Sequence, residues 1–230
     1  MKKNFDIILQ SRYQSSRLPG KILLGFNKTN FLSYLIKNLK KLKNIRNIII
    51  SSPDDEFKDV FKTYAKKNKV SFYAPKNVNE KNVLKRFVKT ANFYNSRNII
   101  RITSDCPFIN IPMINKMTKY YKVKSLEYIA NNNPRYVPHG FDCEIFSYKV
   151  LKQSLNNCKN KNNLEHVTPW IRSRHNKPTN YVQFYENNYS KYRLTLDTIN
   201  DYLFFLKYQK LLIKVPLSQN PIKILKKIKK

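Results

Sequence analysis

The sequence is poor in acidic residues, glycine and cysteine, and these shortages narrow the classes of protein to which it can belong. Only 14 of its 230 residues are Asp or Glu, and it has three glycines, three cysteines and one tryptophan. The cysteines are odd in number and lack metal-ligand spacing, so we expect a reduced, cytoplasmic protein. Apolar runs are only a few residues long, which excludes a membrane-spanning helix. The apolar segment after the basic start MKK is also too short for a signal peptide.

The shortage of acids leaves a large positive charge. Lys and Arg number 45, and the formal net charge of +31 suggests nucleic acid or an anionic membrane as a partner. However, 35 of the 45 cations are lysine, spread over the whole chain alongside 29 asparagines. Because Lys and Asn share A/T-rich codons, a biased genome is a sufficient explanation, and the diffuse charge favours it over a functional polyanion surface. The C-terminal PIKILKKIKK is the best local candidate for such a surface, although we favour a short amphipathic helix with a solvated basic face.

What is present indicates a folded α/β protein. The chain is 41% hydrophobic, contains 16 Tyr and 14 Phe, and has a length that fits one domain. Its first half alternates predicted strands with predicted helices, and such alternation with near-continuous apolar strands indicates a sheet covered on both faces. Ser52 and Asp54 are the candidate caps of the second helix. The strands are predicted at 5–10, 47–51, 70–74 and 98–103, and the helices at 31–42, after 52–57 and at 80–95.

After about residue 125 the pattern becomes irregular. No repeat or low-complexity linker divides the chain, so we expect a single domain. The predicted strands are at 126–130, 143–146, 181–185 and 193–196, and the predicted helices are near 148–157, near 163–174 and over 201–213.

Polar residues gather where predicted strands end, which is where ligands bind in open α/β sheets. The stretch QSRYQSSRLPGKIL follows the first strand and places Arg12, Arg17 and Lys21 around two serines and a Pro-Gly, and we expect the Arg17 and Lys21 side chains to be exposed. Asp105 and Asp197 each follow a later predicted strand. Mg²⁺ takes one or two carboxylates together with substrate phosphates, and Arg and Lys neutralise the remaining phosphate oxygens. The pattern is therefore typical of a nucleoside-triphosphate site, although a surface ion pair or a helix cap explains each acid taken alone.

These motifs resemble a known family. QSRYQSSRLPGKIL resembles the N-terminal signature of sugar-acid cytidylyltransferases, and five further motifs follow in the family's order: NVLKRF, IIRITSDCPFI, YVPHGFDCEIF, EHVTPWI and RLTLDTINDY. Together they resemble the spore-coat-polysaccharide type of cytidylyltransferase-like protein, related to acylneuraminate and 3-deoxy-manno-octulosonate cytidylyltransferases, over about residues 5–210. The chain departs from the pattern at Asn82, where this type often carries Asp, and at Trp170, where Tyr is commoner.

The resemblance implies a fold and a reaction. The fold is a three-layer α/β/α nucleotidyltransferase fold with a mixed, mostly parallel sheet. It forms one domain over 1–230, with a nucleotide-binding part at about 1–125, a sugar-binding part at about 126–212 and a basic tail at 213–230. In the reaction, which depends on Mg²⁺, a hydroxyl group of a sugar acid attacks the α-phosphate of CTP, and pyrophosphate leaves. A homodimer is one expectation for the assembly.

The resemblance also implies roles for single residues. The implied catalytic residues are Arg17, Lys21 and Asp105, and Mg²⁺ is held by Asp105 and Asp197. The nucleotide-binding residues are Gln10, Arg12, Ser15, Ser16, Arg17, Gly20, Lys21 and Thr103, and the sugar-binding residues are His139, Asp142, Glu144, Glu165, His166 and Arg193.

Some of these residues have a structural alternative that the sequence leaves open. Gly20 allows close approach to a phosphate or a positive φ, or else forms an ordinary turn. Glu165 and His166 are expected to open a helix, where a carboxylate is favourable without any ligand. Arg193 is equally well explained as a structural cation, and Arg86, in NVLKRF, as part of a solvated helix face.

Two other functions compete with nucleotidyl transfer. A glycosyltransferase on the same type of fold would use a nucleotide sugar, but RLPGK at the first strand suits a triphosphate better. A nucleic-acid-binding protein is supported only by net charge, so we expect no specific nucleic-acid partner. The sequence does not identify the sugar or establish CTP as the only nucleotide used.

Overall fold

A six-stranded sheet forms the centre of the protein. The computed structural model describes residues 5–158, 161–175, 177 and 180–228. The strand order is β5-β4-β1-β6-β8-β7, in which β8 is antiparallel to both of its neighbours and the other pairs are parallel. The expected mixed, mostly parallel sheet is therefore confirmed. The strands are β1 (Phe5–Gln10), β4 (Ile45–Ser51), β5 (Ser71–Tyr73), β6 (Asn98–Thr103), β7 (Tyr128–Ala130) and β8 (Glu144–Ser147), and a small separate hairpin joins β2 (Gly25–Phe26) to β3 (Thr29–Asn30).

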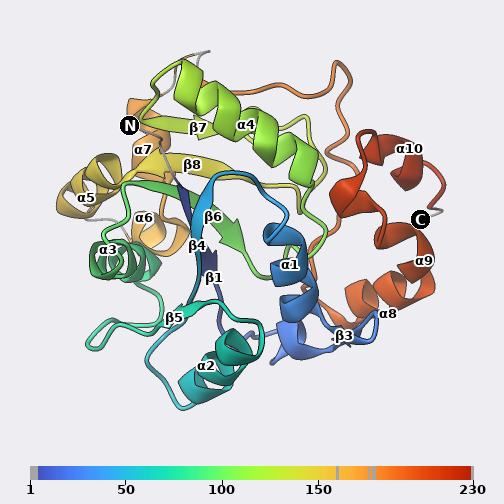
Figure 1. The fold of residues 1–230 in the computed structure, drawn as a ribbon, viewed down its shortest axis with the longest axis horizontal. Coiled ribbons are helices and arrows are strands. Elements are labelled where there is room, and N and C mark those ends of the chain that lie inside the picture. The colour runs from blue at the N-terminus through green and yellow to red at the C-terminus, as the bar shows by residue number, and fades with distance from the viewer. Residues whose placement is uncertain (1–4, 159–160, 176, 178–179, 229–230) are drawn as a thin grey trace.

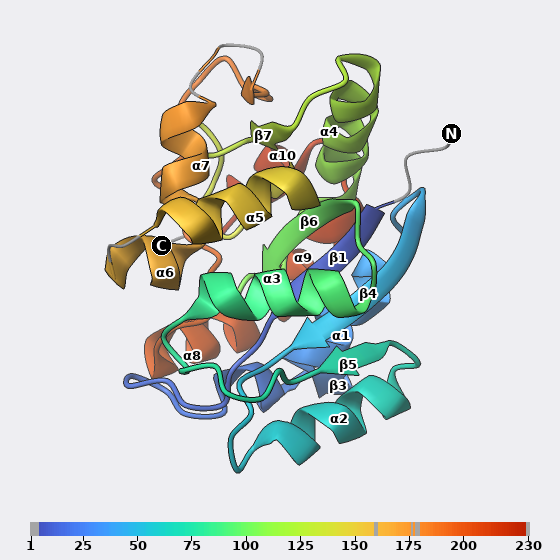
Figure 2. The same ribbon diagram turned by 90° about the vertical axis from the view of Figure 1, so that its left-hand side faces the viewer.

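Helices cover both faces of this sheet, as Figures 1 and 2 show. One face packs against α1 (Phe31–Leu39), α2 (Lys58–Lys67) and α4 (Ile111–Val123). The other packs against α3 (Val83–Phe93), α5 (Tyr148–Asn157) and the region of α6 (Lys161–His166) and α7 (Pro169–Arg174). The structure therefore has the three α/β/α layers that the sequence indicates.

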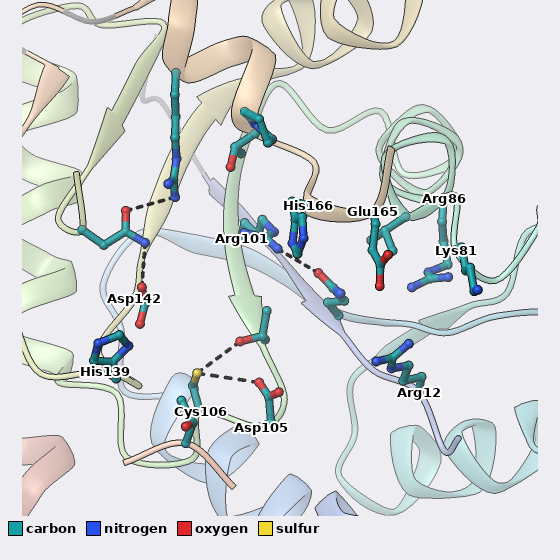
Figure 3. A pocket seen from close by; sticks show the side chains of 18 of the residues that line it. Arg12, Lys81, Arg86, Arg101, Asp105, Cys106, His139, Asp142, Glu165 and His166 are labelled. Carbon is teal, nitrogen blue, oxygen red and sulfur yellow. Dashed lines mark hydrogen bonds between the residues drawn. The ribbon is translucent and has the colours of Figure 1, made fainter. Parts of the chain in front are cut away.

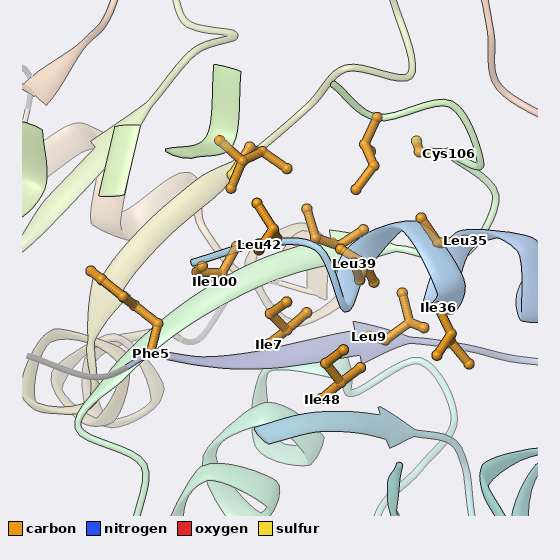
Figure 4. Close-up of a cluster of buried hydrophobic side chains, with 14 of the residues drawn as sticks. Phe5, Ile7, Leu9, Leu35, Ile36, Leu39, Leu42, Ile48, Ile100 and Cys106 are labelled. Atoms are coloured by element: carbon orange, nitrogen blue, oxygen red, sulfur yellow. The ribbon is translucent and has the colours of Figure 1, made fainter. Parts of the chain in front are cut away.

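Burial on both faces explains the apolar strands. In β1, Ile7 and Leu9 point into the core beside α1, and Ile8 points into the opposite core beside α3. Figure 4 shows Leu35 and Leu39 of α1 packed over the first of these faces. Because successive side chains of a strand point to opposite faces, a doubly covered strand is apolar at nearly every position.

Asparagine begins several of the helices in this glycine-poor chain. Asn30, Asn82 and Asn110 cap α1, α3 and α4, and each side chain accepts a hydrogen bond from the backbone N–H three residues later. Asn82, which departs from the family pattern, thus supplies the side-chain cap that an Asp would also supply. The expectation for α2 was wrong: neither Ser52 nor Asp54 caps it, because the helix begins only at Lys58, after Phe57.

The second half differs more from the sequence prediction. Residues 181–185 and 193–196, as described, form isolated β-bridges through Tyr181 and Arg193 instead of strands. The expected helix near 163–174 divides into α6 and α7 at Val167, whose φ of +67° lies in the left-handed region. The predicted helix over 201–213 likewise becomes α8 (Ile199–Lys207) and α9 (Gln209–Leu212).

The C-terminal helices close the end of the molecule beside α1 and β3 (Figure 1). With α10 (Pro221–Leu225) they bury a third apolar cluster, which includes Phe31, Phe108 and Phe205. The expected short helix in PIKILKKIKK is α10, and its Ile222 and Leu225 are buried in that cluster. None of the helices in the described ranges is both long and apolar enough to cross a bilayer.

Candidate active site

The crevice of this sheet lies where β1 meets β6. After β1 the chain adds β4 and β5 on one side of it in the sheet and then returns to add β6 on the other side. The carboxyl ends of β1 and β6 therefore form a topological switch point. Gln10 pairs with Thr103 at the end of the two strands. The Ser104 N–H then donates to the Gln10 carbonyl at 3.0 Å, and the Ser104 hydroxyl donates to it at 2.9 Å. The loops after the two strands therefore start side by side.

A lysine joins the two aspartates that were predicted at strand ends. The Lys21 ammonium lies 3.2 Å from Asp105 Oδ2 and 2.7 Å from Asp197 Oδ1. The Leu196 N–H donates to the Asp105 carbonyl at 2.8 Å, and this backbone bond brings the two segments together across the sequence. The carboxylates converge, as expected. The expectation that the Lys21 side chain is exposed was wrong: Lys21 is only 8% exposed, because both carboxylates enclose its ammonium.

Asp197 is held from several directions. Arg193 forms a close ion pair with it, and Arg17 lies 3.2 Å from its Oδ1. The Asp197 N–H donates to Asp201 Oδ2 at 2.9 Å, and Asp201 also completes the capping box of α8 with Thr198. Burial raises the pKa of the Asp197 carboxyl, but Lys21 and the two arginines outweigh burial, so the pKa lies below its usual value. Asp197 is therefore a fixed, ionised carboxylate, and the structure places Arg193 against it.

The loop after β1 folds back on itself. The Tyr13 ring stacks on Phe57 with 4.0 Å between ring centroids. The Gly20 N–H donates to the Tyr13 carbonyl at 2.9 Å, and Gly20 has a φ of +65°, the positive φ that was considered for it. A Cβ at this position would lie 3.1 Å from the Tyr13 ring, so the close neighbour is Tyr13. Ser15 and Ser16 are not among the residues that line the cavity described next, and neither are Arg17, Gly20, Lys21, Arg193 and Asp197.

A cavity of about 610 Å³ opens beside these loops (Figure 3). It brings together residues from both predicted parts of the chain, including Gln10, Arg12, Thr103 and Asp105 from the first part. Six of its lining residues are cationic and four are acidic, so the lining favours an anionic ligand. The cations are Arg12, Lys81, Arg86, Arg101, Arg135 and Arg172, and the acids are Glu80, Asp105, Asp142 and Glu165.

Glu144 lies behind the cavity wall and accepts hydrogen bonds from three residues that line it, Arg101, Arg172 and Thr168. Its side chain is buried, and it accepts from Arg101 at 2.8 Å, from Arg172 at 2.8 and 2.9 Å, and from the hydroxyls of Tyr128 and Thr168, each at 3.0 Å. Burial raises the pKa of the Glu144 carboxyl, but the two arginines outweigh burial, so the pKa lies below its usual value. Glu144, which was predicted to bind the sugar, is 2% exposed and is not among the residues that line the cavity. Its contacts position two arginines, and a contact with the sugar stays a prediction.

The other predicted sugar-binding residues have different positions. Asp142 lines the cavity and pairs with Arg135, while the Gly140 N–H donates to Asp142 Oδ2 at 3.0 Å. His139, Glu165 and His166 also line the cavity. The expectation that Glu165 and His166 open a helix was wrong, because both lie at the end of α6.

Gly140 has a steric role that the sequence did not reveal. Its φ is +96°, and a Cβ on it would lie 2.8 Å from the Leu194 backbone. The His139 carbonyl accepts from the Leu194 N–H at 2.8 Å, so segment 139–140 lies directly against the segment that leads to Asp197. A side chain at Gly140 would separate these segments.

Arg86 is the most unusual cation of the cavity. It is 1% exposed, although a solvated helix face was considered for it, and that alternative was wrong. One guanidinium nitrogen donates to the Glu80 carbonyl at 3.0 Å, but Nε finds no hydrogen-bond partner among the described residues. Burial lowers the pKa of Arg86 to about 10. An arginine in this state gains an additional partner when an anion enters the cavity.

Several lining residues were not anticipated from the sequence. Among them are Glu80, Lys81, Asn132, Arg135 and Arg172. Arg172 directly follows EHVTPWI, and Glu80 and Lys81 shortly precede NVLKRF, so proximity to a motif is the only signal that could have found them.

The two aspartates suit a magnesium ion that also binds phosphates. Within the described residues, no group of three or more His, Cys, Asp or Glu side chains gathers as a metal cage. Asp105 and Asp197 would supply two oxygen ligands to such an ion, and substrate phosphates and water would supply the others. The donor set fits Mg²⁺, and the role of the two residues as its ligands stays a prediction.

Comparison with known proteins agrees with this geometry. Residues 7–227 match the family model described as cytidylyltransferase. An uncharacterised protein of Methanocaldococcus jannaschii is 32% identical over 208 residues, which cover 88% of this chain and 82% of that protein. The spore coat polysaccharide biosynthesis protein SpsF of Bacillus subtilis is 30% identical over 205 residues, covering 85% of this chain and 82% of SpsF.

Solved structures show the same fold. A cytidylyltransferase from Leptospira borgpetersenii has a TM-score of 0.83 and 29% identity, with 99% of this chain and 94% of that chain covered. A CMP:2-keto-3-deoxy-manno-octonic acid synthetase complexed with CTP has a TM-score of 0.64 at 12% identity, covering 92% of this chain and 99% of that one. The family match over nearly the whole chain, together with the strand ends and the cationic cavity described above, leads to one conclusion: the chain belongs to the cytidylyltransferase family.

Proposed function

We propose that the protein transfers the cytidylyl group of CTP to a hydroxyl group of a sugar acid and releases pyrophosphate, with Mg²⁺ held by Asp105 and Asp197. The observation that carries the proposal is the Lys21 ammonium, which joins these two carboxylates at the edge of an arginine-rich cavity. In the reaction the sugar oxygen forms a bond to the α-phosphorus, the bond from that phosphorus to the bridging oxygen breaks with its electron pair going to pyrophosphate, and the hydroxyl proton passes to water. The cation, when bound, supplies positive charge to the phosphate oxygens.

Lys21 and Arg17 have a changing role in this scheme. Both contact Asp197 in the structure, so both lie where phosphates would meet the carboxylates. With substrate and cation bound, Lys21 and Arg17 would exchange their contacts with Asp197 for phosphate oxygens and would stabilise negative charge on the leaving pyrophosphate. The contacts of Lys21 in the structure thus hold two neighbouring carboxylates in place until the substrate arrives.

A sugar acid fits the part of the cavity lined by Arg135, Arg172 and Asn132. Asn132 accepts from Arg172 at 3.1 Å and donates to Asp142, the partner of Arg135, and a carboxylate of the sugar would be a further partner for these cations. The names of two relatives point in the same direction, since one structural neighbour is a 2-keto-3-deoxy-manno-octonic acid synthetase and SpsF belongs to polysaccharide biosynthesis.

The test is a pyrophosphate-release assay with each nucleoside triphosphate, Mg²⁺ and a panel of sugar acids, run beside parallel reactions with nucleotide sugars and followed by mass spectrometry of the products. We expect release with CTP and a new CMP-sugar of matching mass. Release with another nucleotide would correct the base. Consumption of a nucleotide sugar without pyrophosphate would instead support a glycosyltransferase.

A further inference from the structure

A second cavity, of about 590 Å³, lies on the outer side of α1 and shares no residue with the catalytic cavity. Its walls come from the β2–β3 turn, from α1 and from the C-terminal end of α2, elements that lie in the lower part of Figure 2. Five of its ten lining residues are lysine, and none of the lining residues within the described part of the chain is acidic. We call it the lysine cavity, after Lys28, Lys37, Lys40, Lys67 and Lys69.

Local structure explains some of these lysines. Lys37 and Lys67 lie in the last turns of α1 and α2, where the helix dipole favours a cation. Lys40 is the C-cap residue of α1, and its ammonium donates to the Asn68 carbonyl. Lys28 and Lys69 have neither explanation.

Lys28 and Lys69 occupy backbone positions that disfavour lysine. Lys28 is the second residue of a two-residue hairpin turn, with a φ of +63°, where glycine is usual. Lys69 has a φ of +50° and follows the C-cap of α2 in a Schellman motif, another glycine position. Asparagine tolerates this conformation better than lysine does.

Codon bias alone does not account for this choice. Among the described residues, eight non-glycine positions have a positive φ, and four of them are asparagine. Lysine occurs at two, and both line the lysine cavity. Since A/T-rich codons supply Asn as readily as Lys, lysine at both positions of one cavity indicates a use for the charge.

We propose that the lysine cavity binds a small anion that carries two or more phosphate groups, at a site separate from the catalytic cavity. Five ammonium groups around one hollow form no ion pair with a carboxylate in the described part of the chain, so their charge is available to a ligand. Lysine suits phosphate as a mobile point charge, and the Ser33 and Asn68 side chains add polar groups to the lining.

The lining favours a small anion over a macromolecule. Large apolar side chains that are exposed elsewhere on the described surface, such as Leu203 and Leu206, do not line it, which argues against a membrane surface. Its aromatic residue, Tyr34, is buried and donates its hydroxyl to the Ile213 carbonyl, so it offers no stacking platform for a nucleic-acid base.

The experiment uses inorganic tripolyphosphate as the probe, without divalent cations and at constant ionic strength. Hydrogen exchange measured by mass spectrometry locates binding on the chain, and calorimetry gives its affinity. The test variant is K28N/K69N, which removes two charges and places asparagine where the backbone favours it, so the fold is retained. The matched control is K62Q/K66Q, which removes two lysines of α2 that do not line the cavity.

We expect tripolyphosphate to protect residues 27–29 and 67–69 in the wild type and in K62Q/K66Q. In K28N/K69N this protection should be lost and the affinity of the site should fall about tenfold or more, since two charge contacts are removed. Protection confined to the catalytic loops in the wild type would overturn the proposal. An equal loss of protection in K28N/K69N and K62Q/K66Q would also overturn the proposal, because it would show a response to net charge alone. Duplex DNA serves as a second probe, and protection of these segments by DNA but not by tripolyphosphate would overturn the proposal as well.

Discussion

Replacement of Lys21 by methionine separates the two roles assigned to its ammonium. In the structure the ammonium neutralises Asp105 and Asp197, and in the proposed reaction it binds phosphate. Lys21→Met keeps much of the apolar stem and removes only the charge. Breaking a fully buried ion pair costs about 3–5 kcal/mol. The cost here is smaller, because the Asp105 side chain is 33% exposed and Arg17 and Arg193 still contact Asp197. We therefore expect the free energy of unfolding to fall by about 1–3 kcal/mol.

Magnesium should reverse part of this loss. In the wild type the ammonium competes with a cation for both carboxylates, and in Lys21→Met that competition is absent. Millimolar Mg²⁺ without nucleotide should therefore raise the melting temperature of the variant more than that of the wild type, by mass action. The rate of pyrophosphate release should fall about 30- to 1000-fold, since one charge-assisted phosphate contact is lost from the transition state.

The control is Lys58→Met, which breaks another lysine–aspartate pair, to Asp54, at the surface. We expect this variant to change stability much less and to respond to Mg²⁺ as the wild type does, because exposed ion pairs contribute little. Differential scanning fluorimetry across a magnesium titration measures both effects. An identical magnesium response of Lys21→Met and the wild type would refute the assignment of Asp105 and Asp197 as a cation site, and undiminished turnover would refute the phosphate contact.

Three further substitutions test the surroundings of the site. Arg86→Met should leave the melting temperature unchanged or raise it, because burial of this guanidinium is unfavourable, while the affinity for CTP measured by calorimetry should fall about tenfold or more. Glu144→Gln should lower the free energy of unfolding at pH 7 by about 2–4 kcal/mol, since it leaves Arg101 and Arg172 without their carboxylate. Because the pKa of Glu144 is lower in the folded state, the stability that its carboxylate contributes is present above the unfolded-state pKa and is lost as pH falls through the folded-state pKa. Urea unfolding should therefore show that the difference in free energy of unfolding between the wild type and Glu144→Gln becomes smaller below about pH 4. A difference that does not change with pH would contradict the ion-pair account. Gly140→Ala should lower the free energy of unfolding and slow turnover. Unchanged stability and turnover in this variant would show that the Leu194 backbone can move aside.

The first half of the chain was predictable because its strands are buried on both sides. FDIILQ and NIIRIT each contain adjacent apolar residues that point to opposite faces of the sheet, and the helices between them start at capping residues such as Asn30 and Asn82. The second half was harder to predict because some of its extended segments hydrogen-bond to loop residues and not to neighbouring strands. Residues 193–196 alternate like a strand, yet the Leu194 N–H donates to the His139 carbonyl and the Leu196 N–H donates to the Asp105 carbonyl, and neither acceptor lies in a strand. A period-2 pattern indicates burial of alternate side chains, and here that burial occurs without a neighbouring strand.

The candidate site could be located from the sequence, but its internal contacts could not. Asp105 and Asp197 were found because each lies where a polar motif follows an apolar segment. The contacts of Glu144 with Arg101 and Arg172 join residues 43 and 28 positions apart, so no local pattern reveals them. The burial of Lys21 and Arg86 was missed for a related reason, since lysine and arginine are mostly exposed and only tertiary partners hold them inside.

The scarcity of acids connects the composition with the site. With 45 cations and 14 acids, the chain cannot neutralise its positive charge internally, and a single carboxylate of the site serves several cations. Glu144 contacts two arginines, and Asp197 contacts Lys21 and two arginines. The cavity, with six cationic and four acidic lining residues, therefore retains positive charge that an anionic ligand would balance. Under the proposed function that ligand is a triphosphate, whose negative charge matches what the lining lacks, and the field of the whole chain increases its local concentration at the crevice. A high positive net charge is typical of nucleic-acid-binding proteins, but it also suits an enzyme whose substrates are small anions.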